Sequence, residues 1–254
     1  SMRYTYDNSA DNPRNPVQPP VRVFWGQRSA DEMGDLWIQV LTRDEHDLQV
    51  LNDQFRTKVI TEDTIGYERW LQSEPESAAL HDTVAAIYLE LNKPQDAVRH
   101  FRASAHLQPE SASAHFNLGT ALTVAGDYES AVLEYQRALA IKKDYAQAHN
   151  NLASILLNTG KVQEALGHLN DAIKLDPKNP QAHYNAAIAS VRQGRHADAI
   201  AHLKTVVQLS PESSTAAIDL AWLLACAPQE SLRDPGLAIR LAERVVRVTN
   251  KKDA

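Results

Sequence analysis

Small and apolar residues recur along this chain with a period of 34 residues. Alanine repeats at that spacing, and a large apolar residue follows each alanine four positions later. The alanine series is Ala97, Ala131, Ala165 and Ala199, and the apolar series is Phe101, Tyr135, Leu169 and Leu203. A period of this length indicates a stack of helical hairpins, in which each hairpin covers the open apolar side of the one before.

The period divides the chain into four units, 78–111, 112–145, 146–179 and 180–213, whose positions are numbered 1 to 34 below. Positions 8 and 20 are small, which predicts that two antiparallel helices approach closely there. Position 15 is Asn92, Gly126, Gly160 and Gly194, which are residues that tolerate a left-handed turn. Position 32 holds Pro109, Pro177 and Pro211, with Lys143 in the remaining unit, and proline ends the second helix because it cannot continue the hydrogen-bond ladder.

The pattern weakens at both ends of the array. Residues 42–77 are interpreted as a degenerate first repeat and cap, with one helix starting after Thr42 and a second over about 62–73. Residues 214–254 are interpreted as a degenerate fifth repeat, with about five residues inserted in the 227–235 loop and a C-terminal cap helix over about 236–249. Residues 1–41 alternate like short strands at 21–25 and 36–41. The predicted fold is therefore an all-α superhelix with a short extended, β-like N-terminal segment.

The repeating positions resemble the tetratricopeptide repeat. The best unit reads Ala112-Ser-Ala-His-Phe-Asn-Leu-Gly-Thr-Ala-Leu and continues with Gly126-Asp-Tyr-Glu-Ser-Ala131. The resemblance is strong over 78–213 and weaker over 44–77 and 214–249. It implies a right-handed superhelix whose first helices line a concave groove, and a groove that binds an extended peptide or a partner helix.

Position 6 carries asparagine in three consecutive units, and the resemblance implies that this position faces the groove. An amide side chain offers both a donor and an acceptor to a peptide group. The alternative is that these asparagines only cap neighbouring helices. Position 5 lacks the lysines and arginines of a charge clamp, so a mixed, neutral groove is expected. The candidate peptide-binding residues are Asn117, Thr120, Asn150, Asn151, Ser154, Asn158, Tyr184, Asn185, Ile188 and Arg192.

Position 4 is histidine in every unit: His81, His115, His149 and His183. A histidine stripe suggests a metal site or a pH switch. Stacked hairpins lie about 10 Å apart, whereas metal–nitrogen bonds are about 2 Å long. We therefore expect packing residues with a weak acid sensitivity, and no metal site or cofactor.

Composition narrows the function classes. A net charge of -6 argues against non-specific nucleic-acid binding, and no window has the roughly 18 apolar residues of a membrane span. The single cysteine, Cys226, excludes an intrachain disulfide and is predicted to be a buried small apolar residue. No nucleophile, phosphate-binding or zinc-finger motif occurs, so we expect no catalytic residue and no enzymatic activity in this chain.

The first 40 residues resemble the end of a copper type II, ascorbate-dependent monooxygenase domain, through Tyr6-Asp-Asn-Ser-Ala-Asp-Asn-Pro-Arg-Asn-Pro16 and the stretch from Val23 to Trp37. In that family two histidines and one methionine hold the catalytic copper, and the methionine lies in an Asp-Glu-Met turn that Met33 matches. No histidine precedes His46. Met33 is therefore expected to be a remnant of a copper ligand.

The leading hypothesis is a non-enzymatic scaffold that binds a protein or peptide in the groove. One alternative is the C-terminal tail of a bacterial copper monooxygenase, which would position a substrate or partner. Another is self-association as a homodimer through residues 1–41, whose apolar strands expose edges. The monooxygenase resemblance weakly favours the periplasm or export over the cytoplasm.

Overall fold

The computed structural model describes residues 45–250, which are helical throughout apart from the connecting turns. In this range the helices are α1 (Glu45–Ser73), α2 (Ala78–Glu90), α3 (Pro94–Leu107), α4 (Ala112–Val124), α5 (Tyr128–Ile141), α6 (Ala146–Asn158), α7 (Val162–Leu175), α8 (Pro180–Arg192), α9 (His196–Leu209), α10 (Ser214–Cys226), the 3-10 turn η1 (Glu230–Leu232) and α11 (Pro235–Asn250). The described residues include no strand, which confirms the all-α prediction for this part of the chain. None of its helices combines the length and the apolar character that crossing a bilayer requires.

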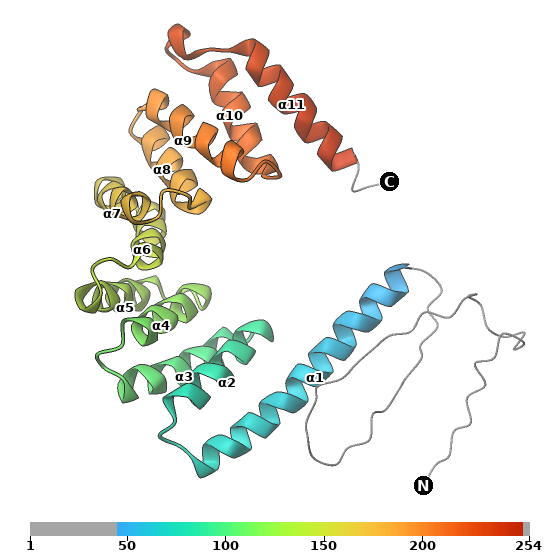
Figure 1. The fold of residues 1–254 in the computed structure, drawn as a ribbon, viewed down its shortest axis with the longest axis vertical. Coiled ribbons are helices and arrows are strands. Elements are labelled where there is room, and N and C mark those ends of the chain that lie inside the picture. The colour runs from blue at the N-terminus through green and yellow to red at the C-terminus, as the bar shows by residue number, and fades with distance from the viewer. Residues whose placement is uncertain (1–44, 251–254) are drawn as a thin grey trace, which may run out of the picture. The chain divides into compact units, whose positions relative to one another are not determined.

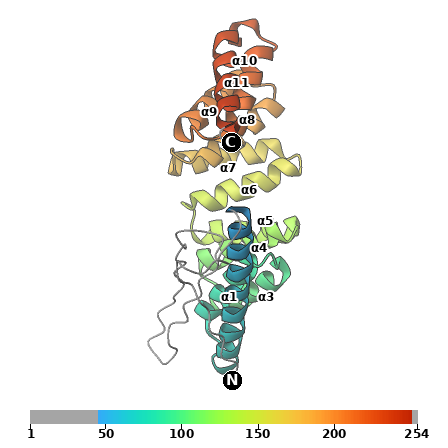
Figure 2. The ribbon, with the colours of Figure 1, turned by 90° about the vertical axis from the view of Figure 1, so that its right-hand side faces the viewer.

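The chain divides into two units, residues 1–66 and 67–254. In the first, the described residues 45–66 all belong to α1. In the second, five hairpins follow one another in chain order: α2/α3, α4/α5, α6/α7, α8/α9 and α10/α11 (Figures 1 and 2). The second helix of each hairpin packs against the first helix of the next. Every hairpin therefore has sequence neighbours as its main packing partners.

The turn between the two helices of a hairpin is made as predicted. Gly126, Gly160 and Gly194 have φ angles of 83°, 79° and 70°, and Asn92 has a φ of 55°. Most L-residues avoid this left-handed region, because the Cβ atom approaches the following carbonyl. In the four hairpins from α2 to α9, the position-15 residue reverses the chain after the first helix.

The small residues mark the closest helix approach. The position-20 alanines, such as Ala131, are fully buried. At position 8, a Cβ added to Gly119 would lie 2.9 Å from the ring of Tyr135 on α5. Only glycine fits at this contact, because a methyl group would displace the aromatic ring that fills the hairpin.

The predicted first hairpin is wrong. α1 is one continuous helix of 29 residues, with no turn between the two helices expected over 42–73. The 34-residue period places Lys58 where the later units carry asparagine or glycine. Without a residue that favours the left-handed conformation, the helix has no local reason to end there.

Cys226 is also placed differently from the prediction, because it is exposed. It occupies position 13 of the fifth unit, where the earlier units carry exposed Asn158 and Arg192. The predicted insertion is a compact loop containing η1, in which the Arg233 Nε atom donates to the Ala227 carbonyl at 2.8 Å. The strand-like segments, Met33 and the proposed dimer contact through 1–41 lie outside the described residues.

Candidate binding surface on the first helices

The ten predicted binding residues all lie on α4, α6 and α8, at recurring positions of the first helix. Their exposure separates them into three groups. Asn150 and Asn185 are buried, and Asn158 and Arg192 are exposed. Asn117, Thr120, Asn151, Ser154, Tyr184 and Ile188 are half-buried.

The asparagines of α6 and α8 are linked to one another. The Nδ2 atom of Asn185 donates to Oδ1 of Asn150 at 3.0 Å, across the boundary between two hairpins. Asn150 donates in turn to Oδ1 of Asn151 at 3.3 Å, and Asn151 donates to the hydroxyl of Tyr135 at 3.3 Å. A buried amide needs such partners, since losing them costs about 1–3 kcal/mol. For Asn150 and Asn185, this geometry gives the amides a structural role, because they join neighbouring first helices through their side chains.

Contacts between adjacent first helices continue toward the C-terminus. The hydroxyl of Tyr184 on α8 donates to Oδ2 of Asp219 on α10 at 2.7 Å. Burial and the hydrogen bond to this carboxylate raise the pKa of Tyr184 to about 12. Arg192 donates to the main-chain carbonyl of Leu157 on α6. These contacts hold α6, α8 and α10 in register.

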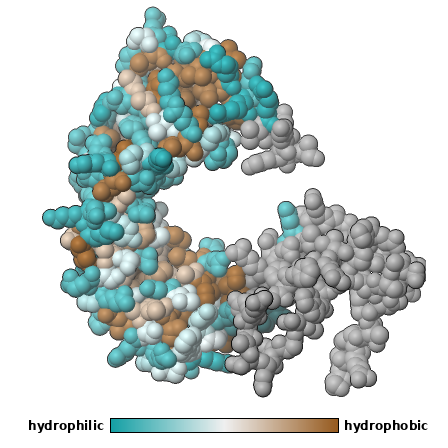
Figure 3. All heavy atoms as spheres, in the orientation of Figure 1, coloured by the Kyte–Doolittle hydropathy of each residue, from teal (hydrophilic) through white to brown (hydrophobic). Residues whose placement is uncertain are grey.

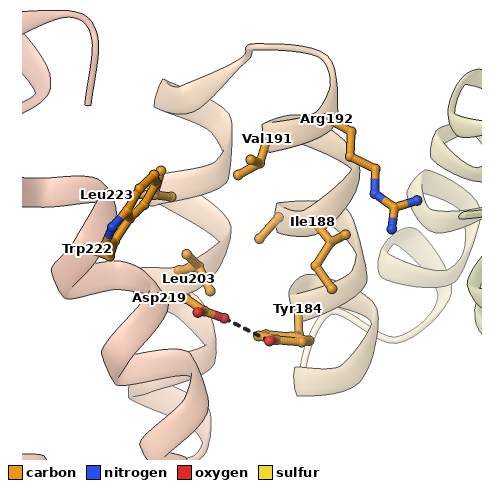
Figure 4. Close-up of a pocket in the computed structure, with 9 residues that line it drawn as sticks. Tyr184, Ile188, Val191, Arg192, Leu203, Asp219, Trp222 and Leu223 are labelled. Atoms are coloured by element: carbon orange, nitrogen blue, oxygen red, sulfur yellow. Dashed lines mark hydrogen bonds between the residues drawn. The ribbon is translucent and has the colours of Figure 1, made fainter. Parts of the chain in front are cut away.

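A pocket with a volume of about 310 Å³ lies between α8 and α10. Ile188 and Val191 line one side, and Trp222 and Leu223 line the other, as Figure 4 shows. The side chain of Arg192 turns away from the pocket toward α6 in this view. Trp222 is 62% exposed, although tryptophan is usually well covered by protein. The pocket therefore has an open aromatic wall.

Apolar surface gathers over the C-terminal hairpin, at the top of Figure 3. The exposed large apolar residues of α10 and α11 include Ile218, Trp222 and Ile239, each more than half exposed. Exposed apolar side chains that cluster beside a pocket mark an interaction surface more often than isolated ones do.

Tyr184 and Ile188 are among the residues predicted from the sequence, whereas Asp219 and Trp222 are not. Trp222 stands at position 9 of the fifth unit, which corresponds to Ile188 in the fourth. Asp219 stands at position 6, which corresponds to Asn185. Extending the same 34-residue numbering into the fifth unit would have found both, because the first helix of that unit keeps its register.

Comparison with known proteins agrees with this architecture. A family profile described as tetratricopeptide repeat matches residues 85–149, 135–180 and 150–214, which together cover just over half of the chain. The curated proteins include no match.

Several solved structures share the fold at low sequence identity. MamA 41-end from Desulfovibrio magneticus RS-1 has a TM-score of 0.61 and 20% identity, over 70% of this chain and 97% of that chain. PilF of Pseudomonas aeruginosa has a TM-score of 0.60 and 21% identity, over 69% of this chain and 78% of that chain. YrrB, described as a TPR protein with an unusual peptide-binding site, has a TM-score of 0.56 and 16% identity, over 72% and 91%. At these identities the likeness shows the fold alone.

Proposed function

We propose that this chain, which belongs to the tetratricopeptide repeat family, is a non-enzymatic interaction scaffold. Members of the family bind protein or peptide partners, and in this proposal the chain binds an extended peptide or partner helix along its first helices. In this proposal the pocket between α8 and α10 takes one apolar side chain of the ligand. The exposed indole of Trp222 at the wall of that pocket is the observation that carries the proposal.

The size of the pocket suits one side chain. A volume of about 310 Å³ is at the lower end of the range for small-ligand sites. Covering an aromatic wall contributes strongly to binding, since tryptophan is enriched among the residues that dominate interface energies. A partner that places a Leu, Ile or aromatic side chain here would cover Trp222 and Ile188 together.

Polar groups on the preceding first helices, α4 and α6, suit a peptide backbone. Asn117, Asn151 and Ser154 are half-buried on α4 and α6, and a side-chain amide or hydroxyl can pair with peptide N–H and C=O groups. Asn150 and Asn185 contribute indirectly, by holding α6 and α8 in register. YrrB, which shares the fold, is described as having a peptide-binding site, and this is in keeping with the proposal.

The test is a selection of peptides from a random displayed library on the full chain, followed by affinity measurements on variants. Trp222→Ala is expected to weaken a selected peptide by roughly 30-fold or more, because truncating a central aromatic residue costs about 2 kcal/mol or more. Leu133→Ala is the matched control, since Leu133 on α5 is also an exposed apolar residue at 57%. The control is expected to leave the affinity unchanged.

Two further measurements sharpen the result. Circular dichroism of Trp222→Ala should match the parent chain, because an exposed side chain contributes little to folding. Selected peptides that bind Trp222→Ala and the parent equally would refute the pocket as the anchor. A change in sedimentation on Trp222→Ala without peptide would identify a second copy of the chain as the occupant.

A further inference from the structure

A second recurring feature lies inside each hairpin, away from the candidate binding surface. The position-4 histidine of the first helix meets position 23 of the second helix. Three hairpins pair two histidines through their Nδ1 atoms: His81 with His100 at 3.0 Å, His149 with His168 at 2.9 Å, and His183 with His202 at 3.0 Å. The hairpin α4/α5 pairs His115 with Glu134 instead, at 2.6 Å.

The main chain decides which ring nitrogen carries the proton. The Nε2 atom of His149 lies 3.0 Å from the carbonyl oxygen of Lys143. A carbonyl only accepts, so this Nε2 carries the hydrogen and the Nδ1 atom of neutral His149 presents a lone pair. His168 must then donate from its own Nδ1. A backbone carbonyl that fixes the far nitrogen is the arrangement that orients metal-ligating histidines in proteins.

The hairpin α6/α7 adds a carboxylate to this pair. Asp171 lies one helical turn after His168 on α7, and its Oδ2 atom is 4.0 Å from Nδ1 of His149. The two imidazoles and this carboxylate bring their ligand atoms within 4.8 Å of one another. Among the described residues this is the one group of three such side chains.

The other units lack the third ligand. Position 26, which holds Asp171 here, holds Ala103, Arg137 and Thr205 in the remaining three units. The Arg137 Nη1 atom donates to Glu134 at 2.6 Å, so that unit forms a small ion-pair cluster instead. The histidine pair alone is thus a structural element of the fold, and Asp171 is the addition specific to one unit.

We propose that the hairpin α6/α7 binds a divalent transition metal of the zinc class through Nδ1 of His149, Nδ1 of His168 and the carboxylate of Asp171. Two imidazoles and one carboxylate are a donor set that suits Zn²⁺ and its neighbours, with a fourth position left to water or a partner. The side chain of Asp171 is 60% exposed, so the ion has a route from solvent.

The required movement is small. Zn–N bonds of about 2.0–2.1 Å in tetrahedral geometry separate the two nitrogens by roughly 3.3 Å, so the pair opens by about 0.4 Å. The exposed carboxylate moves inward by about 0.7 Å relative to Nδ1 of His149, and by no more than about 1.5 Å relative to His168, to meet the same spacing. On binding, the proton on Nδ1 of His168 moves through solvent to Nε2 of the same ring, so the two rings release no net proton. Burial lowers the pKa of His168, and this keeps its ring neutral and available as a ligand at neutral pH.

A metal site was not expected from the sequence, because the position-4 histidines of neighbouring repeats lie too far apart to share an ion. The structure pairs each of them with a residue of its own hairpin, 19 positions later. Position 23 also recurs every 34 residues, but only the rotation of one helix against the other shows which side chains meet.

The experiment uses the untagged full chain after treatment with a chelator. Zn²⁺ is titrated calorimetrically, and Co²⁺ serves as a spectroscopic probe because four-coordinate cobalt absorbs in the visible range. One equivalent is expected to bind. The Glu164→Gln variant is the control, because it removes a charge one turn before His168 without removing a ligand, and it should lose only the small electrostatic contribution of that carboxylate. Asp171→Thr, which copies the fourth unit, should weaken binding at least as much as the roughly 10- to 100-fold that losing an outer-shell partner costs.

A gain-of-site variant completes the test. Thr205→Asp supplies a carboxylate next to the pair His183 and His202, and it should add a second equivalent of cobalt with the same visible spectrum. Circular dichroism without metal controls for folding, and Asp171→Thr should match the parent there. Absence of zinc binding by the parent chain, or equal binding by the parent and Asp171→Thr, would overturn the proposal.

Discussion

At the scale of single residues, the position-23 histidines act as hydrogen-bond donors in surroundings that disfavour a charged ring. Burial is the first cause that lowers the pKa values of His100, His168 and His202. A second proton on a position-23 ring enters at Nε2 and leaves the Nδ1–H donor in place, so the cost of acid is the positive charge held in a buried ring. Acid sensitivity therefore belongs to the three hairpins with histidine pairs, whereas α4/α5 has a carboxylate at the same place.

His202 allows this idea to be tested away from the proposed metal site. The groups that act on it are His183 and Arg195, which lower its pKa, and Asp198, which raises it. A lowered pKa in the folded state means that the stability contribution is complete above the unfolded value of about 6.5 and is lost as pH falls through that value toward the folded one.

His202→Asn keeps an N–H donor for His183 but removes the titration. We expect the unfolding free energy of the parent to drop between about pH 7.5 and pH 5.5, and His202→Asn to show a smaller drop. Urea denaturation with chelator present measures both, and exposed His106→Asn is the control. Identical pH profiles for His202→Asn and the parent would contradict this account.

At the scale of helices, the inter-helix turn depends on one residue per unit. Gly160 has a φ of 79° and open space where a Cβ atom would lie, so glycine is required here by conformation and not by crowding. Gly167 lies inside α7, also with open space, and glycine weakens a helix interior by about 1 kcal/mol relative to alanine. The same hairpin thus contains two glycines with opposite roles.

The two alanine substitutions should change stability in opposite directions. Gly160→Ala is expected to destabilise by about 1–2 kcal/mol, since alanine must enter the left-handed region. Gly167→Ala is expected to stabilise by about 0.5–1 kcal/mol, because it raises helix propensity without a steric contact. Chemical denaturation measures both, and a Gly160→Ala variant as stable as the parent would show that the turn adopts another conformation without cost.

At the scale of the whole repeat stack, residues 67–254, the apolar core is divided along the chain of hairpins. One buried cluster runs from the hairpin α2/α3 to α8, and another runs from α8 to α11. Leu152 belongs to the first cluster and is 1% exposed, and Leu224 belongs to the second and is 2% exposed. A stack in which each hairpin contacts mainly its neighbours has local stability that is set by local packing.

Leu224→Ala should therefore loosen only one end of the stack. The substitution is expected to cost about 2–5 kcal/mol, as for other buried leucines, and to raise hydrogen exchange in α9, α10 and α11. Exchange in α4 and α5 should stay near that of the parent. Leu152→Ala, with the same chemistry in the middle of the stack, should raise exchange on both sides. A uniform rise of hydrogen exchange from α2 to α11 in Leu224→Ala would mean that the whole stack unfolds as one body.

Much of this architecture follows from the sequence alone, because it depends on properties of individual residues. Backbone freedom places the turns at Asn92, Gly126, Gly160 and Gly194. The small side chain of Gly119 predicts close helix packing, and the same 34-residue numbering places Tyr184 and Ile188 on one surface. The prediction from the sequence was wrong at α1, where only the absence of a turn residue at Lys58 distinguishes a long helix from a hairpin.

The tertiary structure decided which side chains meet. The bonds from Asn185 to Asn150 and from Tyr184 to Asp219 depend on how α6, α8 and α10 are rotated and shifted against one another. The exposure of Trp222 depends on what α11 leaves uncovered, and the meeting of His149, His168 and Asp171 depends on the crossing of α6 and α7. Periodicity specifies that such residues recur, but the distances between their atoms arise only when the helices are packed.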